Sequence, residues 1–320
     1  MGRPERQASS GLATTGWHRI NGAACQRRVR SLQRRIVQAV QAGAWRKVKR
    51  LRSRLVHACA GRALAVTRVT EHAGQKTPGV DGALWNTPAK QAHAVACIGR
   101  WQGDRSAPLR RGYIPKKNGP QRPLSIPTLA DRARQAVSLQ ALQPVAETTA
   151  DPNAYGFRPK RRCADAIDRC FKVLRQHSSA TWIVAGDIHG LFDHIRFSWM
   201  AAHIPRNKRI LAPWLRSGFL DRGTLVPTSA GAPHGGSSSP AVSNMVLDGR
   251  EPVVHGSNWQ RRVHDINDVR WADDFIVTAH SRQVREDTVR PRINAFLAVR
   301  GVRLSPTKTA ITPISQGFDC

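Results

Sequence analysis

The tetrapeptide Trp271-Ala272-Asp273-Asp274 stands between two short runs, residues 266–269 and 275–277, that form a strand-turn-strand pattern. Two adjacent carboxylates at the tip of such a unit repel each other in the free protein. They therefore suit a site where divalent cations and a polyanionic substrate arrive together, which indicates nucleotidyl transfer. Taken alone, an Asp-Asp pair is also ordinary turn chemistry at a solvated hairpin tip.

A second carboxylate decides between these two interpretations. Residues 181–193 read Thr-Trp-Ile-Val-Ala-Gly-Asp-Ile-His-Gly-Leu-Phe-Asp, a β-rich run that ends on Asp187 before glycine lets the backbone turn toward a helix. If this strand and the strand-turn-strand are neighbours in one sheet, Asp187 and Asp273 meet. The sequence therefore predicts a shared carboxylate site built from distant segments.

The composition indicates the kind of substrate. The chain has 51 Lys and Arg against 21 Asp and Glu, a formal charge of +30 over 320 residues, which favours phosphate backbones as partners. No apolar run approaches the roughly eighteen residues that span a bilayer, so a membrane is not expected as a partner. Six cysteines without a C-x-x-C pair indicate neither a zinc knuckle nor a disulfide framework. A cytoplasmic location fits best, with an organellar transit peptide as the less favoured alternative.

The N-terminal region is basic and amphipathic. Residues 6–70 contain no acid, and apolar residues recur at helical spacing on either side of Ala42-Gly43, first at Val29, Leu32, Ile36 and Val40 and then at Trp45, Val48, Leu51 and Leu55. Two helices joined at a glycine turn are predicted. We expect their basic faces to contact RNA rather than to be merely solvated, through Arg34, Arg35, Arg46, Lys47, Lys49 and Arg50.

Further elements follow along the chain. Residues 111–127 predict a hairpin that turns at Asn118-Gly119, and Asp131 starts a predicted helix that is interrupted at Pro144. A rigid turn at 155–159 precedes a helix near 164–175, and Ser239-Pro240 is a good helix start for 241–247.

The ordered set of motifs resembles the reverse transcriptases of group II introns and their retron-type relatives, over about residues 17–320. The motifs are Trp45-Arg46-Lys47-Val48, Thr77-Pro78-Gly79-Val80-Asp81-Gly82, the hairpin at 113–127, Tyr155-Gly156-Phe157-Arg158-Pro159, the segments 186–193 and 231–240, Trp271-Ala272-Asp273-Asp274, and Leu304-Ser305-Pro306-Thr307-Lys308-Thr309.

The resemblance implies an α+β right-hand polymerase with fingers, an antiparallel palm sheet and a basic helical N-terminal extension. It places the extension at residues 1–75, the fingers at 76–180 and the palm at 181–320, with part of the fingers within about 200–235. It implies an enzyme of a bacterial mobile element, an RNA-directed DNA polymerase that extends a DNA or RNA primer with dNTPs on a structured intron or noncoding RNA template. Because the similarity ends at Cys320, we expect no thumb or maturase region, weak processivity, and a protein partner that supplies thumb function.

Roles of individual residues also follow from the resemblance. Asp187, Asp273 and Asp274 would hold two Mg²⁺ ions beside the backbone of Ile188, and Lys308 would protonate the leaving pyrophosphate, unless it is simply a solvated lysine. Phe192 would exclude a 2′-hydroxyl, although a core aromatic fits the same position. The remaining residues expected at the nucleotide are Lys116, Arg122, His189, Gly190, Leu191, His234 and Gly235, and Arg158 joins those expected at RNA.

Two departures from the family pattern concern the site itself. Trp271 stands where the family usually has Tyr, and His234 stands where it usually has Gln beside the nascent base pair. Two alternatives remain at this stage. One is a maturase-like RNA-binding protein or degenerate remnant without catalysis, and the other is a retron-type or defence-associated transcriptase that works on its own noncoding RNA.

Overall fold

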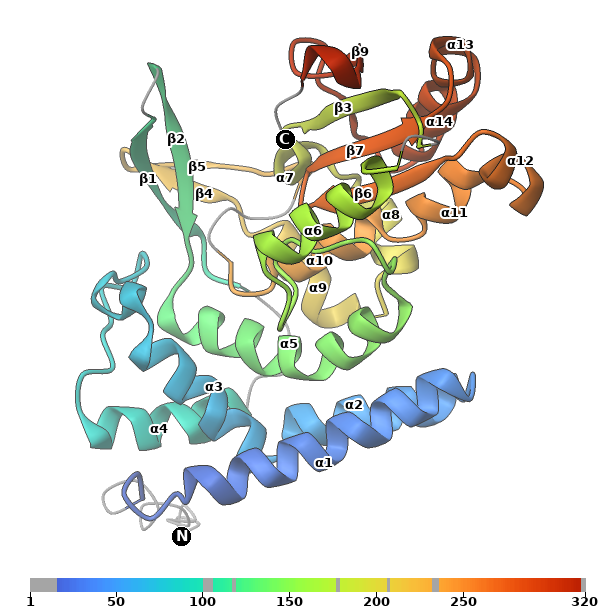
Figure 1. The fold of residues 1–320 in the computed structure, drawn as a ribbon. Helices are drawn as coiled ribbons and strands as arrows, with labels where there is room; N and C mark the ends of the chain where they lie inside the picture. Colours follow the sequence, from blue (N-terminus) through green and yellow to red (C-terminus); the bar gives the residue numbers. More distant parts are fainter. Residues whose placement is uncertain are drawn as a thin grey trace, which may run out of the picture. The chain divides into compact units, whose positions relative to one another are not determined.

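The computed structural model describes residues 16–99, 106–116, 119–176, 179–205, 208–231 and 236–317. The chain divides into two compact units (Figure 1). Unit 1 comprises residues 1–148, 206–228 and 234–238, and unit 2 comprises residues 149–205, 229–233 and 239–320. The segment 206–228 therefore belongs to unit 1, although the residues directly before and after it belong to unit 2. The functional boundaries expected near residues 75 and 180 remain predictions.

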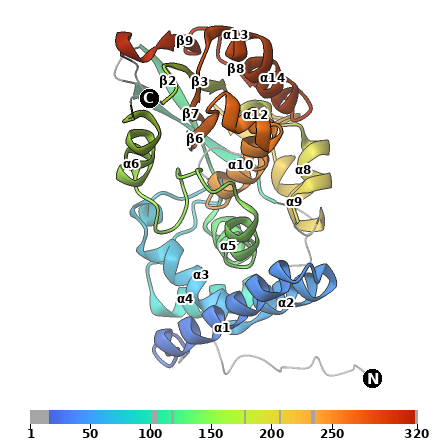
Figure 2. The same cartoon turned by 45° about the vertical axis from the view of Figure 1, so that its right-hand side comes forward.

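Helices form most of unit 1. They are α1 (Gly22–Gln41), α2 (Trp45–His57), α3 (Cys59–Glu71), a short 3₁₀ turn (Ala73–Lys76), α4 (Pro88–Gly99), α5 (Leu129–Thr149) and α9 (Lys208–Leu215). The two predicted N-terminal helices and their glycine turn are confirmed, with Gly43 at φ 63°. Helices α1 and α2 lie side by side in both views (Figure 1, Figure 2).

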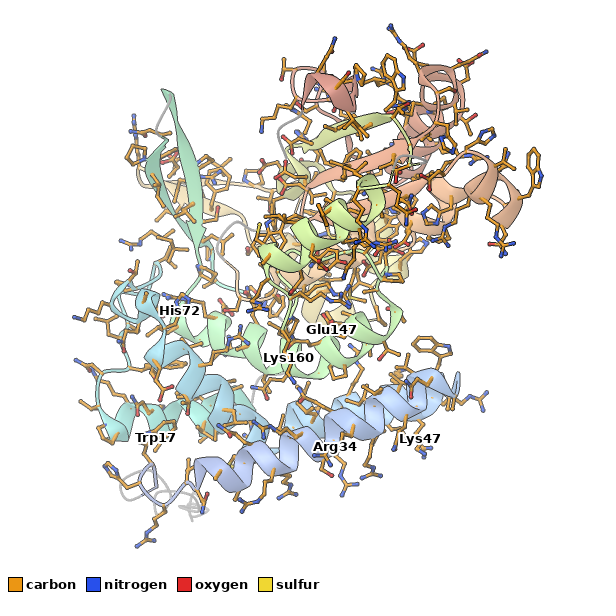
Figure 3. The ribbon with its side chains drawn as sticks, in the orientation of Figure 1. Trp17, Arg34, Lys47, His72, Glu147 and Lys160 are labelled. Carbon is orange, nitrogen blue, oxygen red and sulfur yellow. The ribbon has the colours of Figure 1, made fainter. Side chains whose placement is uncertain are left out.

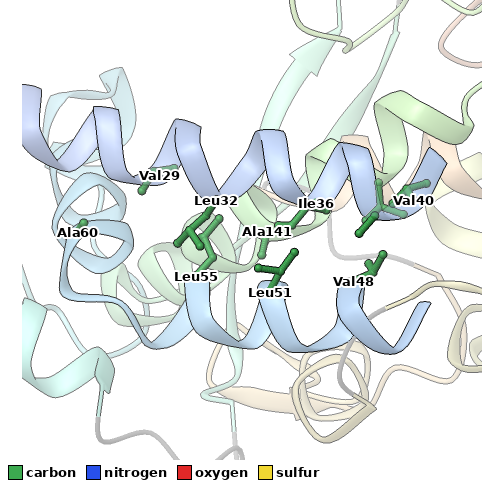
Figure 4. Close-up of a cluster of buried hydrophobic side chains, with 11 residues drawn as sticks. Val29, Leu32, Ile36, Val40, Val48, Leu51, Leu55, Ala60 and Ala141 are labelled. Atoms are coloured by element: carbon green, nitrogen blue, oxygen red, sulfur yellow. The ribbon is translucent and has the colours of Figure 1, made fainter. Parts of the chain in front are cut away.

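The core between α1 and α2 consists of the residues whose spacing predicted it. Val29, Leu32, Ile36, Val40, Val48, Leu51 and Leu55 are buried in one cluster with Ala39, Ala60, Ala141 and Val145 (Figure 4). Burial of a Val, Leu or Ile side chain stabilises by about 1.5–3 kcal/mol, which explains how such basic helices hold together. Trp45 was expected in this apolar set, but it lies at the first position of α2 and is 53% exposed.

Helix α5 corrects a prediction. It runs without interruption from Leu129 to Thr149 and contains Pro144, where the sequence predicted a break. Proline lacks the N–H that would donate to the carbonyl four residues earlier. That carbonyl, at Gln140, instead accepts a hydrogen bond of 2.9 Å from the side-chain Nε2 of Gln33 on α1. The helix continues because a distant residue satisfies the acceptor that proline leaves open.

The sheet of unit 1 has the order β2-β1-β4-β5. Its strands are β1 (Leu109–Lys116), β2 (Gly119–Ile126), β4 (Phe219–Asp221) and β5 (Thr224–Val226). The predicted hairpin is confirmed by antiparallel pairing of β1 with β2, while the turn residues 117 and 118 lie outside the described residues. Strand β4 pairs parallel to β1, and Tyr113 donates a hydrogen bond of 2.7 Å from its hydroxyl to Asp221.

Unit 2 is built on an antiparallel sheet. Strand β3 (Trp182–His189) lies between β7 (Asp274–Ala279) on one side and two short strands on the other, β8 (Arg303–Leu304) and β9 (Ala310–Pro313), and β6 (Asn267–Trp271) pairs with the outer side of β7. The predicted strand-turn-strand and the strand that ends near Asp187 are therefore neighbours. The sheet and the N-terminal helices confirm the predicted α+β class.

Helices pack around this sheet. They are α6 (Cys163–Leu174), α7 (Leu191–His194), α8 (Phe197–His203), α10 (Ser239–Leu247), α11 (Arg250–His255), α12 (Asn258–Val263), α13 (Arg282–Val284), a π turn (Arg285–Val289), α14 (Arg290–Ala298) and a 3₁₀ turn (Ile314–Gln316). The helices predicted near 164–175 and 241–247 are confirmed. Helix α6 covers Val269 and Ile276 on one face of the sheet through Ala166 and Cys170, together with Tyr155 of the preceding loop. Within the described residues, no helix combines the length and the apolar character that a membrane crossing requires.

Candidate active site

Asp187 and Asp274 lie directly opposite each other on adjacent strands. The register of β3 and β7 pairs Gly186 with Phe275 and Asp187 with Asp274. Opposed residues of an antiparallel pair point to the same face with Cβ atoms about 4.5–5.5 Å apart, so both carboxylates leave the sheet on one side. The residue opposite Asp187 is thus Asp274 rather than Asp273, the partner expected from the sequence. Asp187 is 9% exposed.

Asp273 lies one residue earlier, in the two-residue turn between β6 and β7. The turn begins at Ala272, which has a left-handed φ of 58°. Desolvation raises the pKa of the Asp274 carboxyl, and the negative charges of Asp273 and Asp187 raise it further. The three carboxylates therefore act on one another electrostatically, as groups that share a cation site would.

Lys308 supplies a positive charge to this group. Its Nζ donates a hydrogen bond of 2.7 Å to Oδ2 of Asp187, and this bond and the charge of Asp187 raise the pKa of the lysine. The loop 305–309 that carries it interrupts one edge of β3 between β8 and β9, where the N–H of Ser305 donates to the carbonyl of Asp187 at 2.8 Å. The lysine side chain is 68% exposed and that of Asp187 is 13% exposed.

The residue before Asp187 must be glycine because the space for a side chain is occupied by a neighbouring ring. A Cβ at this position would lie 2.7 Å from Cζ of Phe275, which is 2% exposed. The Phe275 ring also has the guanidinium of the fully buried Arg250 at 4.1 Å from its centroid. Because the ring cannot move away, only glycine allows β3 to pack against β7 at this level.

Strand β3 continues two residues beyond Asp187, where the sequence predicted its end, because Ile188 and His189 pair with β8; the chain then turns toward a helix at Gly190. Ile188 and Leu191 are buried, and Gly190 has φ 51° and caps α7. A Cβ at Gly190 would lie 2.9 Å from the ring of His194, which stacks on the exposed His189. The side chain of Phe192 is half-buried.

A later segment also reaches α7. Gly231 has φ 89°, and its N–H donates to the carbonyl of Ile195 at 2.9 Å. A Cβ at Gly231 would lie 2.4 Å from the carbonyl oxygen of Phe192. Gly231 therefore lies against α7. His234 and Gly235, expected at the nucleotide, lie outside the described residues.

The remaining predicted residues belong to other parts of the chain. Lys116 ends β1, and Arg122 lies on β2 opposite Ile114. The six basic residues expected to contact RNA on α1 and α2 are all exposed, and Arg34 and Lys47 are labelled in Figure 3. Arg158 differs from them, because it is 8% exposed and its Nη1 donates to the carbonyls of Asp151 and Ala154. This placement makes Arg158 a packing residue of its loop, unlike the exposed basic residues of α1 and α2.

Sequence reasoning missed the residues that hold the Asp273 turn from behind. Arg270 and Asn244 are buried, and Nη1 of Arg270 donates to the Ala272 carbonyl at 3.3 Å and to Oδ1 of Asn244 at 3.1 Å. An arginine between Val269 and Trp271 in an otherwise strand-like run was the available signal. A buried charge next to a functional motif indicates a positioning role.

The donor set fits a hard divalent cation. It consists of carboxylate oxygens, and the Lys308 ammonium stands in as a cation on Asp187. Within the part of the chain that the structure describes, no three His, Cys, Asp or Glu side chains are grouped closely enough to hold an ion by themselves. Mg²⁺ commonly uses one or two carboxylates together with substrate phosphates and water, so an all-protein cage is not required.

Comparison with known proteins identifies the family. The profile described as "Reverse transcriptase (RNA-dependent DNA polymerase)" matches residues 114–318, and that of the "N-terminal domain of reverse transcriptase" matches residues 17–98. The chain belongs to the reverse transcriptase family. The carboxylates Asp187, Asp273 and Asp274 and the lysine Lys308 of this reverse transcriptase all lie within the matched region 114–318.

Individual relatives agree with this assignment. The chain is 28% identical to "Protein YkfC" of Escherichia coli (strain K12) over 77% of this chain and 74% of that protein. It is 33% identical to "Group II intron-encoded protein LtrA" of Lactococcus lactis subsp. cremoris over 44% of this chain, which is 24% of that protein. These matches confirm the predicted resemblance to the group II intron type. The chain spans about a quarter of the length of LtrA.

Among solved structures, the chain is similar to telomerase from Candida tropicalis in complex with a fragment of telomeric RNA. The TM-score is 0.49 at 12% identity, over 67% of this chain and 42% of that one.

Proposed function

We propose that this chain catalyses RNA-templated DNA synthesis from a primer terminus, with Asp187, Asp273 and Asp274 holding two Mg²⁺ ions. The observation that carries the proposal is the register that sets Asp187 of β3 opposite Asp274, the first residue of β7, with Lys308 paired to the Asp187 carboxylate. RNA adhesion alone has no use for a group of carboxylates in a chain with a formal charge of +30.

The magnesium ions, when bound, stabilise the charge of the triphosphate and favour deprotonation of the primer 3′-hydroxyl. The residues of the chain have complementary tasks. Asp187 and Asp274 present their oxygens from rigid strands, and Asp273 presents its own from the turn between β6 and β7. Because strands hold such groups more precisely than loops do, catalysis here rests on positioning and charge stabilisation.

Lys308 holds the proton that the leaving group needs. Its pKa is raised by the hydrogen bond to Asp187, so the ammonium form prevails at neutral pH. When a triphosphate arrives, Nζ can leave Asp187 and donate to the pyrophosphate oxygens. The exposed position of the side chain leaves it free to make this exchange.

Nucleotide selection is proposed for the turn after β3. The backbone of Ile188 to Leu191 would contact the triphosphate, and the ring of Phe192 would exclude a 2′-hydroxyl by bulk. Lys116 and Arg122 on the β1–β2 hairpin would contribute fixed positive charge. His234 and Gly235 would contact the nucleotide beside the nascent base pair. RNA would bind the exposed basic residues of α1 and α2 through its phosphates.

Primer extension tests the proposal. Poly(rA)/oligo(dT) is extended with dTTP and Mg²⁺ by the native chain and by Asp273→Ala. A matched control is Asp168→Ala, which removes an exposed carboxylate of α6 that pairs with Lys172. We expect extension by the native chain and the control, and none by Asp273→Ala.

A non-catalytic RNA-binding function is the second candidate, favoured by the exposed basic residues of α1 and α2. The same three proteins distinguish it. If the native chain extends no better than Asp273→Ala while both bind RNA equally tightly, the protein is an RNA-binding relative that does not polymerise. Sequencing the RNA that co-purifies with the native chain identifies an intron or a noncoding RNA as its partner.

A further inference from the structure

Arg270 lies behind the carboxylate turn. Side chains alternate along a strand, so Arg270 on β6 points to the face of the sheet opposite to Asp274, together with Phe275 and Gly186. It is 3% exposed, and its Nη2 pairs with Asp248 Oδ1 at 2.9 Å. Its Nη1 donates to the carbonyl of Ala272, the first residue of the turn, at 3.3 Å.

Asn244 of α10 connects this arginine to a second segment. Its Oδ1 accepts from Arg270 at 3.1 Å, and its Nδ2 donates to the carbonyl of Gly156 at 2.7 Å. The chain at Gly156 is itself tied to β6, because Tyr155 N donates to the Arg270 carbonyl and Arg270 N donates to the Asn153 carbonyl, both at 2.9 Å. Three segments that are distant in sequence therefore meet at the turn.

Gly156 also lies tightly against the turn. A Cβ at this position would lie 2.3 Å from the backbone nitrogen of Ala272 and 2.9 Å from its Cβ. The close approach is a backbone contact that no side chain can relieve by rotating. Ala272 keeps its left-handed φ of 58° between this contact and the hydrogen bond from Arg270. Such conformations persist in non-glycine residues only where the surroundings fix them.

We propose that Arg270, Asn244 and Gly156 form a turn clamp, which sets the direction in which Asp273 and Asp274 present their carboxylates to a metal ion. The three are positioning residues, since they act through the turn and not on substrate. A buried Arg-Asp pair contributes little net stability because desolvation opposes the Coulomb attraction, so a geometric role accounts for its presence better. The inference rests on the proposed metal-binding function and concerns how that site is held.

The test measures metal binding without catalysis. Tb³⁺ serves as the probe, because it binds carboxylates and emits when a nearby tryptophan is excited, and Trp271 adjoins the turn. Asp273→Ala identifies the part of the signal that belongs to this site. Arg270→Lys keeps the positive charge that pairs with Asp248 but loses the second guanidinium nitrogen, which donates to the Ala272 carbonyl. Gly156→Ala adds a Cβ that displaces the backbone of the turn without removing any buried group.

Arg285→Lys is the matched control. Arg285 is also fully buried, and it donates to the carbonyls of Ser281 and Ala279 at the opposite end of β7, away from the turn. We expect the Tb³⁺ dissociation constant to rise about tenfold in Arg270→Lys and Gly156→Ala, in the range of changes that outer-shell partners of metal ligands produce. In Arg285→Lys the Tb³⁺ dissociation constant should stay within about twofold of native, because Arg285 shares no hydrogen-bond partner with the turn.

The clamp is overturned if both clamp variants bind Tb³⁺ like the native chain, if Arg285→Lys weakens binding as much as they do, or if the native chain gives no Asp273-dependent signal. Should Arg270→Lys fail to fold by circular dichroism, Gly156→Ala carries the test by itself. Failure of the proposed polymerase activity looks different. In that case the native chain does not extend the primer, yet the clamp variants still lose Tb³⁺ affinity.

Discussion

Lys308 allows metal binding and proton donation to be separated. Its ammonium occupies Oδ2 of Asp187, so a metal ion that approaches this carboxylate in the absence of nucleotide must displace it. Replacing Lys308 by Gln removes the competitor. The same substitution removes the proposed proton donor to pyrophosphate, so metal affinity and turnover should change in opposite directions.

The magnitudes follow from the exposure of the pair. Exposed ion pairs contribute about 0.2–1 kcal/mol, and this pair belongs at the upper end because the side chain of Asp187 is only 13% exposed, although that of Lys308 is 68% exposed. A competitor worth about 1 kcal/mol weakens metal binding about fivefold, so Lys308→Gln should bind Mn²⁺ about fivefold more tightly than the native chain. Loss of a general acid lowers the rate of the chemical step by about 10²- to 10⁴-fold.

Lys308→Arg completes the design. Arginine keeps the positive charge near Asp187 but does not give up a proton in this pH range, so metal affinity should stay near native while turnover falls. Free Mn²⁺ measured by electron paramagnetic resonance reports binding, and single-turnover extension with saturating dTTP reports chemistry. If Lys308→Gln binds Mn²⁺ no tighter than native, the ion pair does not compete with metal. If Lys308→Arg extends at the native rate, the lysine is not the proton donor.

Three further outcomes are expected. Gly186→Ala should lower the free energy of unfolding by about 1–3 kcal/mol in urea denaturation, because its Cβ meets the buried Phe275 ring at 2.7 Å; an unchanged midpoint would contradict this packing. Burial raises the pKa of Asp248 to about 6, so its ionisation destabilises the fold as pH rises from about 4 through 6. Asp248→Asn lacks this titration and should therefore gain about 1 kcal/mol relative to native between pH 5 and 7.5, whereas a pH-independent difference would refute the assignment. Arg34→Ala with Lys47→Ala should reduce the slope of log affinity against log salt for RNA by about 0.7 per lost contact, measured by fluorescence anisotropy, and an unchanged slope would remove both residues from the interface.

The sequence predicted most of the elements because local patterns specify them. The spacing of Val29, Leu32 and Ile36 predicted α1, Asn118-Gly119 predicted the hairpin, and Ser239-Pro240 predicted the start of α10. The carboxylate site was predicted from two strands with acidic ends. Its register was not, since pairing Asp187 with Asp274 depends on how β3 and β7 align over their whole length.

What the sequence did not predict depends on contacts between distant residues. Pro144 is accommodated within α5 because Gln33, more than a hundred residues earlier, supplies the missing donor. Arg158 and Arg270 carry the same side chain as the exposed arginines of α1. Their burial is possible because partners elsewhere in the chain accept hydrogen bonds from their guanidinium groups. In so basic a sequence, composition cannot distinguish an arginine that packs the interior from one that faces a phosphate.

The edge of β3 carries a consequence for how the protein loses activity. The backbone on either side of Lys308 pairs with β3 through the short strands β8 and β9, whereas the carboxylates belong to the longer pairing of β3 with β7. Short edge strands open at lower free energy than the centre of a sheet, by local rather than global unfolding. Fraying of β9 would carry the lysine away and leave the acidic residues where they are. Mild heating should therefore abolish extension at a temperature at which far-ultraviolet circular dichroism still reports a folded chain.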